Sequence, residues 1–133
     1  MARIYLTDDD RFLLDLYALK FKNAGHDVST FSSGEELIDA LGKKGAPDAL
    51  LLDVIMPGLS GFETLEKIRQ EKLAGSAKII ILTNQAQGAD VEKAKSLGTA
   101  GYIVKASAIP SEVLAETERI LAGSNAPSLI PAP

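Results

Sequence analysis

The sequence has no cysteine and no tryptophan, and it contains one histidine, His26. Without cysteine, disulfide scaffolds, thiolate metal sites and cysteine nucleophiles are all excluded. A single histidine argues against a histidine-rich metal site, and against a chain that passes phosphate from its own histidine to an acceptor. We interpret His26 as a turn residue.

Long apolar runs and an excess of positive charge are also missing. The apolar runs, such as residues 49–52 and 79–82, are far shorter than the ~20 residues that span a bilayer, so we expect no membrane insertion. Residues 1–7 lead into acidic residues without the apolar core of a signal peptide, which predicts a cytoplasmic protein. The formal net charge of −4 and the pI of 5.0 argue against direct binding to nucleic acid.

The composition is that of an ordinary globular protein. With 133 residues, of which 46% are hydrophobic and 24% charged, the chain fits one domain with a real core. Short apolar or β-branched runs occur at residues 3–6, 27–31, 49–52, 78–82 and 101–104. Each run is followed by a stretch with helical spacing, so the sequence predicts five β–α units in a row.

The helical stretches carry recognisable signals. The first places apolar residues on one face: Leu13, Leu16, Tyr17 and Phe21. Ser33 and Ser60 each stand three residues before a glutamate, the spacing of a capping box, and Pro110 suits the first turn of the last helix.

Five β–α units with short connections predict a parallel sheet covered by helices on both faces. Several of the strand runs are apolar without alternation, which is typical of strands buried on both sides. The size favours a flavodoxin-like doubly wound fold with strand order 2-1-3-4-5 over residues 1–122. Residues 123–133 hold three of the six prolines and lack periodicity, so we expect a mobile tail or a linker there.

Polar residues stand where the predicted strands end. The first strand runs into Asp8, Asp9 and Asp10, and the third, fourth and fifth run into Asp53, Thr83 and Lys105. In open α/β sheets, sites form beyond the carboxyl ends of the strands. Converging carboxylates repel one another unless a cation or raised pKa values intervene, and oxygen ligands alone favour Mg²⁺.

The chemistry that these groups suit is phosphoryl transfer to a carboxylate. Asp53 would be the nucleophile, and Mg²⁺ held by Asp9 and Asp53, with Asp8 through water, would neutralise charge on the transferred group. Lys105 and Thr83 would bind the other phosphoryl oxygens. Each residue alone is commonly a cap, a turn residue or a solvated charge, and it is the combination at four strand ends that favours a site.

At these residues the sequence resembles the receiver domain of two-component response regulators, of the CheY-like kind, over residues 2–122. The resemblance rests on residues 4–10, 51–61, 80–83 and 101–105, with Asp53, Pro57 and Gly61 in the most specific segment. It implies phosphorylation of Asp53 by a histidine kinase or a histidine phosphotransfer protein, with Mg²⁺. Such a domain is a signalling domain that catalyses only its own phosphorylation and dephosphorylation.

The same resemblance assigns further roles. It implies that Asp8 and Asp9 form the acidic pair and that the backbone carbonyl of Ile55 binds the metal. It makes Thr83 the switch hydroxyl and Tyr102 the aromatic that turns inward with it. The output would pass through the surface of helix 4, strand 5 and helix 5 to a protein target or a second copy.

Two positions depart from the family pattern. Ala106 stands where proline with a cis peptide bond is usual, and a cis Lys105–Ala106 bond would cost about 3 kcal/mol over trans. Asn84 stands where a small residue is usual, and we expect it to narrow access to Asp53. Ile55 and Gln85 offer no acid to activate water, which predicts a long-lived phosphoryl group.

Alternatives remain at this level. A pseudo-receiver would have the same fold and signal without phosphorylation. A phosphatase of the haloacid dehalogenase kind also uses an Asp-x-Asp segment, but Phe12 stands where that family has threonine or valine. A flavin-binding module would need free N–H donors after the first strand, where this chain has three aspartates. The chain itself is either a stand-alone receiver or a piece of a longer protein.

Overall fold

A computed structural model describes residues 2–54, 56, 58–83, 88–105, 109–123 and 128–130. The strands are β1 (Arg3–Thr7), β2 (Asp27–Phe31), β3 (Ala49–Asp53), β4 (Lys78–Thr83), β5 (Gly101–Val104) and β6 (Ser128–Ile130). The helices are α1 (Arg11–Asn23), α2 (Gly34–Lys44), α3 (Gly61–Gln70), α4 (Gly88–Ser96) and α5 (Pro110–Leu121). No helix in these ranges is both long and apolar enough to cross a membrane.

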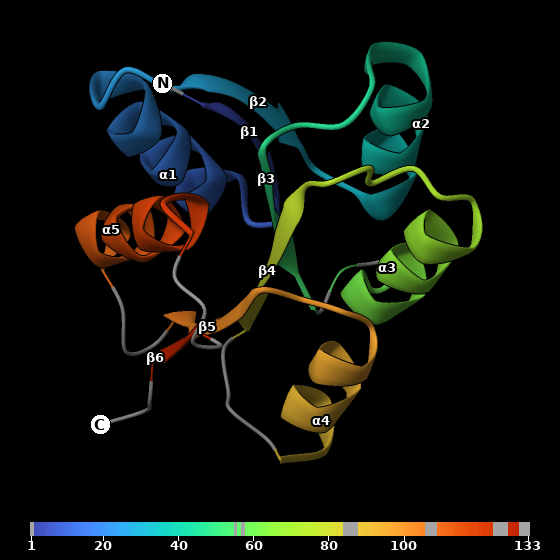
Figure 1. The fold of residues 1–133 in the computed structure, drawn as a ribbon. Coiled ribbons are helices and arrows are strands. Elements are labelled where there is room, and N and C mark those ends of the chain that lie inside the picture. Colours follow the sequence, from blue (N-terminus) through green and yellow to red (C-terminus); the bar gives the residue numbers. More distant parts are fainter. Residues whose placement is uncertain are drawn as a thin grey trace.

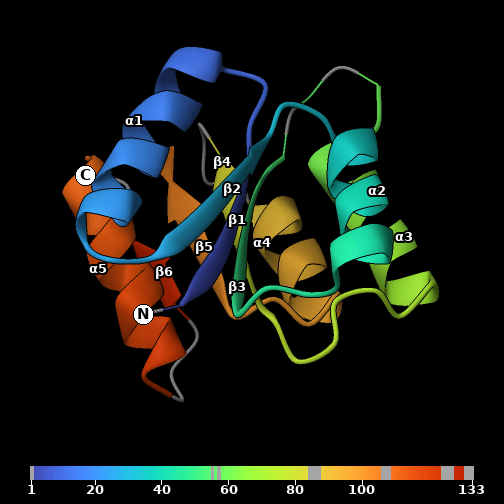
Figure 2. The same ribbon diagram turned by 90° about the horizontal axis from the view of Figure 1, so that it is seen from above.

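All strand pairs of the sheet are parallel, in the order β2-β1-β3-β4-β5-β6. Helices α1 and α5 lie together on one face, and α2, α3 and α4 cover the other (Figures 1 and 2). The first five strands therefore have the predicted order 2-1-3-4-5, and their bounds agree with the predicted runs to within one residue at each end.

The apolar runs form strands because both of their faces are buried. Every residue of β3 is buried, and its side chains alternate between two hydrophobic clusters. Leu50 and Leu52 belong to the cluster under α2, α3 and α4, while Ala49 and Leu51 belong to the cluster under α1 and α5. The sheet therefore lies between two hydrophobic cores, and packing on both faces fixes the position of its carboxyl edge.

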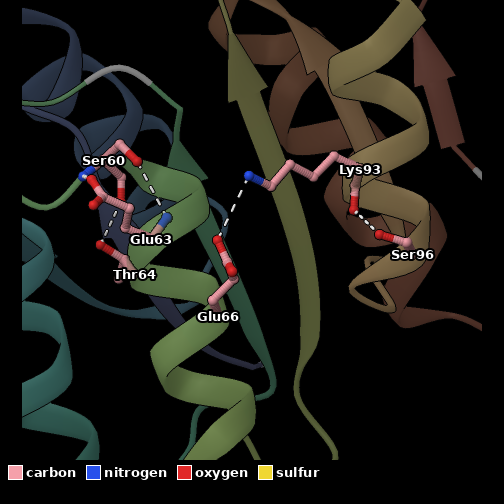
Figure 3. Close-up of polar contacts among 6 residues, drawn as sticks. All are labelled: Ser60, Glu63, Thr64, Glu66, Lys93 and Ser96. Carbon is pink, nitrogen blue, oxygen red and sulfur yellow. Dashed lines mark hydrogen bonds and ion pairs between the residues drawn. The ribbon is translucent and has the colours of Figure 1, made fainter.

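The helix starts follow the predicted capping signals, with one difference. At α3 the Ser60 hydroxyl accepts from the Glu63 N–H, and the Glu63 carboxylate accepts from the Ser60 N–H, which completes the capping box (Figure 3). At α2 the Ser33 hydroxyl accepts from Glu36, but the Glu36 carboxylate binds Ser32 instead. The second box is therefore only half formed, because Ser32 offers both an N–H and a hydroxyl to that carboxylate.

The predicted apolar face of α1 is shifted in the structure. Tyr17 and Phe21 are buried as expected, but Leu16 is 39% exposed, and Leu14 and Ala18 are buried in its place. A helix packed against a sheet buries an apolar stripe about 100° wide. The buried stripe of α1 includes Leu14 and Ala18, whereas the predicted stripe included Leu16.

Two features of the structure go beyond the prediction. His26 lies just before β2, as a turn residue would, and its Nδ1 accepts from the Ala2 N–H while its Nε2 lies 2.9 Å from the Glu118 carboxylate. The strand β6 pairs with β5 inside a segment for which no regular structure was predicted. Three residues between Pro127 and Pro131 are too few to show a strand period.

Candidate functional site

The predicted site residues come together at the carboxyl edge of the sheet. Asp8 directly follows β1, Asp53 and Thr83 end β3 and β4, and Lys105 directly follows β5. Because β1, β3, β4 and β5 are consecutive neighbours in a parallel sheet, these ends lie at one edge. Asp8 is 1% exposed and Asp53 4% exposed, so the polar groups form a buried cluster with one exposed member, Asp9.

Three carboxylates form the centre of the cluster. Asp8, Asp9 and Asp53 each offer an oxygen, and these oxygens all lie within 4.8 Å of one another. The loop is fixed by its own hydrogen bonds, since Asp8 Oδ1 accepts from the Asp10 N–H at 2.9 Å. Asp10 in turn caps α1, its side chain accepting from the Leu13 N–H. The acidic run thus serves the helix and the site at once.

Lys105 supplies the positive charge of the cluster. Its Nζ lies 2.9 Å from Asp8 Oδ2 and 3.4 Å from Asp53 Oδ1, and its side chain is only 6% exposed. Burial lowers the pKa of Lys105, but the hydrogen bond to Asp8 and the charge of Asp53 outweigh burial, and the net pKa is raised. The ammonium group therefore stays charged between the two carboxylates.

The surroundings of Asp53 strongly raise its pKa. Burial, and next the negative charge of Asp8, raise its pKa from 3.8 to about 7, while Lys105 opposes the rise. The ionised pair of Asp8 and Asp53 is thus costly without a further cation. Oxygen donors, negative charge and close spacing fit a hard divalent ion such as Mg²⁺.

Thr83 and Tyr102 lie next to each other across β4 and β5. Both residues are buried, and Tyr102 packs in the cluster under α2, α3 and α4. Burial raises the pKa of Tyr102, and the nearby Thr83 hydroxyl partly opposes that rise. Within the described ranges, the Tyr102 hydroxyl lacks a hydrogen bond of acceptable geometry.

Helix α4 is tied to α3 on the same side of the sheet. The Lys93 ammonium lies 3.6 Å from the Glu66 carboxylate (Figure 3) and 5.2 Å from the centre of the Phe62 ring. Just after the same end of α4, the Arg69 guanidinium donates to the carbonyls of Leu97 and Gly98. These exposed or half-exposed contacts position α4 without burying it deeply.

The loop between β3 and α3 explains the glycine of the most specific sequence segment. The Gly61 N–H donates to the Val54 carbonyl at 2.7 Å. A Cβ at Gly61 would lie 2.1 Å from the Asp53 carbonyl oxygen and 2.7 Å from Val54 Cα. Only glycine lets α3 begin this close to Asp53.

Sequence reasoning missed one residue near the site. Tyr17 was predicted only as part of the apolar face of α1, and it is buried there. Burial raises the pKa of its hydroxyl, which also feels the charges of Lys105 and of Asp8. No spacing signal links a tyrosine in the second turn of a helix to a lysine far along the chain.

Some predicted features lie outside the described residues. These are the Ile55 carbonyl proposed for the metal, Asn84, Gln85 and Ala106 with its peptide bond to Lys105.

Comparison with known proteins agrees with this geometry. The family model described as "Response regulator receiver domain" matches residues 4–116. PilH of Pseudomonas aeruginosa is 30% identical over 124 residues, which cover 92% of this chain and 100% of PilH. The regulator PhoP of Bacillus subtilis, named for alkaline phosphatase synthesis, is 34% identical over 90% of this chain but only 48% of PhoP. The chain thus spans all of one relative and about half of another.

Solved structures give the same result. A LuxR-family response regulator from Aurantimonas sp. is 32% identical with a TM-score of 0.83, over 98% of this chain and 91% of that one. The chemotaxis protein CheY4 of Vibrio cholerae is 27% identical with a TM-score of 0.80, over 90% of this chain and 98% of that one.

The family that matches most of this chain is a signalling domain of two-component systems rather than a classical enzyme, and the acidic cluster with a buried lysine at the carboxyl edge of the parallel sheet agrees with that family. The chain belongs to the response regulator receiver domain family, and its fold is CheY-like.

Proposed function

We propose that the protein accepts a phosphoryl group on Asp53 from the phosphohistidine of a sensor histidine kinase or a histidine phosphotransfer protein. The observation that carries this proposal is the convergence of Asp8, Asp9 and Asp53 within 4.8 Å, with the Lys105 ammonium 3.4 Å from Asp53. Family membership and the burial of this cluster support it further.

The transfer breaks a P–N bond in the donor and forms a P–O bond to an Asp53 carboxylate oxygen, and the neutral imidazole leaves. Asp8, Asp9 and Asp53, with the Ile55 carbonyl, would hold Mg²⁺, which when bound neutralises charge on the transferred group. Lys105 and Thr83 would bind phosphoryl oxygens, so that this chain's own residues position and stabilise the transferring group. No separate acid or base is needed once Asp53 is ionised, because a carboxylate is already nucleophilic, and the Lys105 ammonium beside it favours the ionised form.

The output would follow from a change in charge at Asp53. A phosphoryl group there would attract the Thr83 hydroxyl and the Lys105 ammonium, and Tyr102 packs against the strand that ends at Thr83. We expect this to shift the packing of α4, β5 and α5, the surface through which a protein target or a second copy would bind. We expect neither direct binding to nucleic acid nor membrane insertion by residues 1–122, and we expect the protein to act in the cytoplasm.

The test is intact mass after incubation with Mg²⁺ and acetyl phosphate. We expect a gain of one phosphoryl group that is lost when the metal is chelated. The gain should vanish in Asp53→Asn and persist in Asp48→Asn, which changes an exposed aspartate just before the start of β3, at the opposite end of that strand.

The outcome that overturns the proposal is a folded protein, as judged by circular dichroism, that gains no phosphoryl group. The chain would then be a pseudo-receiver that signals by contact alone. A gain that survives Asp53→Asn would place the acceptor on another residue.

A further inference from the structure

Helix α1 exposes large apolar side chains on the face that points away from the sheet. Among the described residues, the large apolar side chains that are exposed are Phe12, Leu16, Leu19 and Ile109. Three of them belong to α1, where Phe12 is 64% exposed and Leu19 59%. The fourth directly precedes α5, and Pro110 of α5 lines a surface hollow of 340 Å³ together with Leu16 and Leu19. An apolar patch of this kind with a polar rim marks a contact site.

The exposed face of α1 has the spacing of a coiled-coil seam. The seam consists of residues at intervals of four, three and four along the chain: Phe12, Leu16, Leu19 and Asn23. This is the heptad pattern d-a-d-a, which places one row of residues against a second helix. All four residues are exposed, and the buried stripe on the other side of α1 packs against the sheet. Because that packing already holds α1 in shape, a second helix can bind without the cost of folding it.

The charges beside the seam match those of a second, parallel copy. Asp15 stands directly before Leu16, at position g, and Lys20 stands directly after Leu19, at position e. In a parallel pair, position g of one helix faces position e of the next heptad in the other helix, five residues further on. Asp15 of each copy would therefore lie beside Lys20 of the other. This gives one contact between opposite charges on each side of the seam, and both side chains are exposed and accessible for it.

The polar member of the seam favours the same arrangement. In a parallel pair, identical seam residues meet, so Asn23 would lie beside Asn23 of the second copy, where the two amides can hydrogen-bond to each other. A single asparagine at position a sets the register and the number of strands in coiled coils. An antiparallel pair centred between Leu16 and Leu19 would instead place this amide against Phe12.

We propose that α1 binds a second copy of this chain as a parallel pair of helices, through the seam that runs from Phe12 to Asn23. The spacing, the charges and the amide of one copy complement those of another copy, which is why a second copy is the occupant. The seam covers only two heptads, so we expect a weak contact that forms as the protein concentration rises. The inference does not depend on phosphorylation of Asp53 or on the surface of α4, β5 and α5.

Cross-linking tests the geometry, because the chain has no cysteine of its own. Single cysteines are introduced in the seam as Phe12→Cys and Leu19→Cys, and outside it as Arg11→Cys, an exposed position of the same helix. Under mild oxidation we expect disulfide-linked dimers of both seam variants and few of the control, since a disulfide needs Cα atoms within about 7 Å. In the antiparallel pair the two copies of residue 12 would be about 16 Å apart along the helix. Failure of Phe12→Cys to cross-link, or equal cross-linking of Arg11→Cys, therefore overturns the proposal.

Sedimentation equilibrium of the cysteine-free protein tests the charges. We expect the parent to pass from monomer to dimer as its concentration rises. Asp15→Lys should raise the dissociation constant by about 10-fold, because it places two lysines together at each contact. Adding Lys20→Asp to that variant should restore the parent value, and Asp39→Lys, at an exposed aspartate of α2, should leave the value unchanged. A parent that stays monomeric at millimolar concentration overturns the proposal, and so does a dimer that Asp15→Lys does not weaken or that the charge swap does not restore.

Discussion

In the metal-free protein, the ionised form of Asp53 lowers the folding stability because the carboxylate is buried beside Asp8. Its pKa is raised from 3.8 to about 7, so the stability linked to its neutral form is present below about pH 4 and is lost as the pH rises toward 7. We predict that Asp53→Asn is more stable than the parent at pH 7.5 in chelator, by on the order of 2 kcal/mol, and about equally stable at pH 4. Thermal unfolding at the two pH values measures this. A variant less stable than the parent at pH 7.5 would show that Lys105 outweighs Asp8.

Gly61 is a position where one added methyl group should matter. Its Cβ would meet the backbone of Asp53 and Val54 at 2.1 and 2.7 Å, so α3 would have to move away from β3. We predict that Gly61→Ala lowers the free energy of unfolding by about 2 kcal/mol or more, as overpacking against rigid backbone does. Gly42→Ala is the control, because a Cβ there meets nothing within 4 Å in α2 and should stabilise by about 0.5–1 kcal/mol. Chemical denaturation gives both values, and equal effects would refute the close approach.

At the scale of one element, the start of α3 depends on the ionised form of Glu63. Hydrogen bonds from Ser60 hold the pKa of Glu63 below its usual value. The resulting stability is present above the unfolded pKa and is lost as the pH falls through the folded one. We predict that Glu63→Ala lowers the melting temperature at pH 7 and has less effect at pH 3. Glu92→Ala, which removes an exposed carboxylate from α4, is the control; a loss of the same size in both variants at pH 7 would argue against the cap.

The sequence predicts best those elements whose pattern lies within one short segment of the chain. The strands at residues 49–53 and 78–83 contain the continuous apolar runs 49–52 and 79–82, and they were predicted to within one residue. The Ser60–Glu63 spacing lies within one helical turn, and the capping box was also predicted correctly. The convergence of Asp8, Asp53 and Lys105 followed from strand order. The exposure of Leu16, the partner of Glu36 and the proximity of Tyr17 to Lys105 depend on packing between elements. No pattern within one segment carries that information, and the roles of the site residues remain predictions.

For the whole molecule, two cores share one sheet. Leu65 is buried on the side of α3 and Phe21 on the side of α1, and neither has exposed surface. We predict that Leu65→Ala and Phe21→Ala each cost about 2–5 kcal/mol and that each lowers the midpoint of one common transition. Circular dichroism and tyrosine fluorescence should give coincident curves in both variants. Two separate transitions would mean that the faces unfold independently.

The position of β1 between β2 and β3 bears on the order in which the sheet can form during synthesis. Its residues pair with β2 on one side and β3 on the other, and both of these strands follow β1 in the chain, so β1 is synthesised before either of its partners. Lys105, on which Asp8 and Asp53 depend for their counter-charge, is translated much later still. A nascent chain with three strands therefore brings two carboxylates together before their ammonium partner exists. That repulsion favours a half-made sheet that stays open at its acidic edge until the second half of the chain has been synthesised.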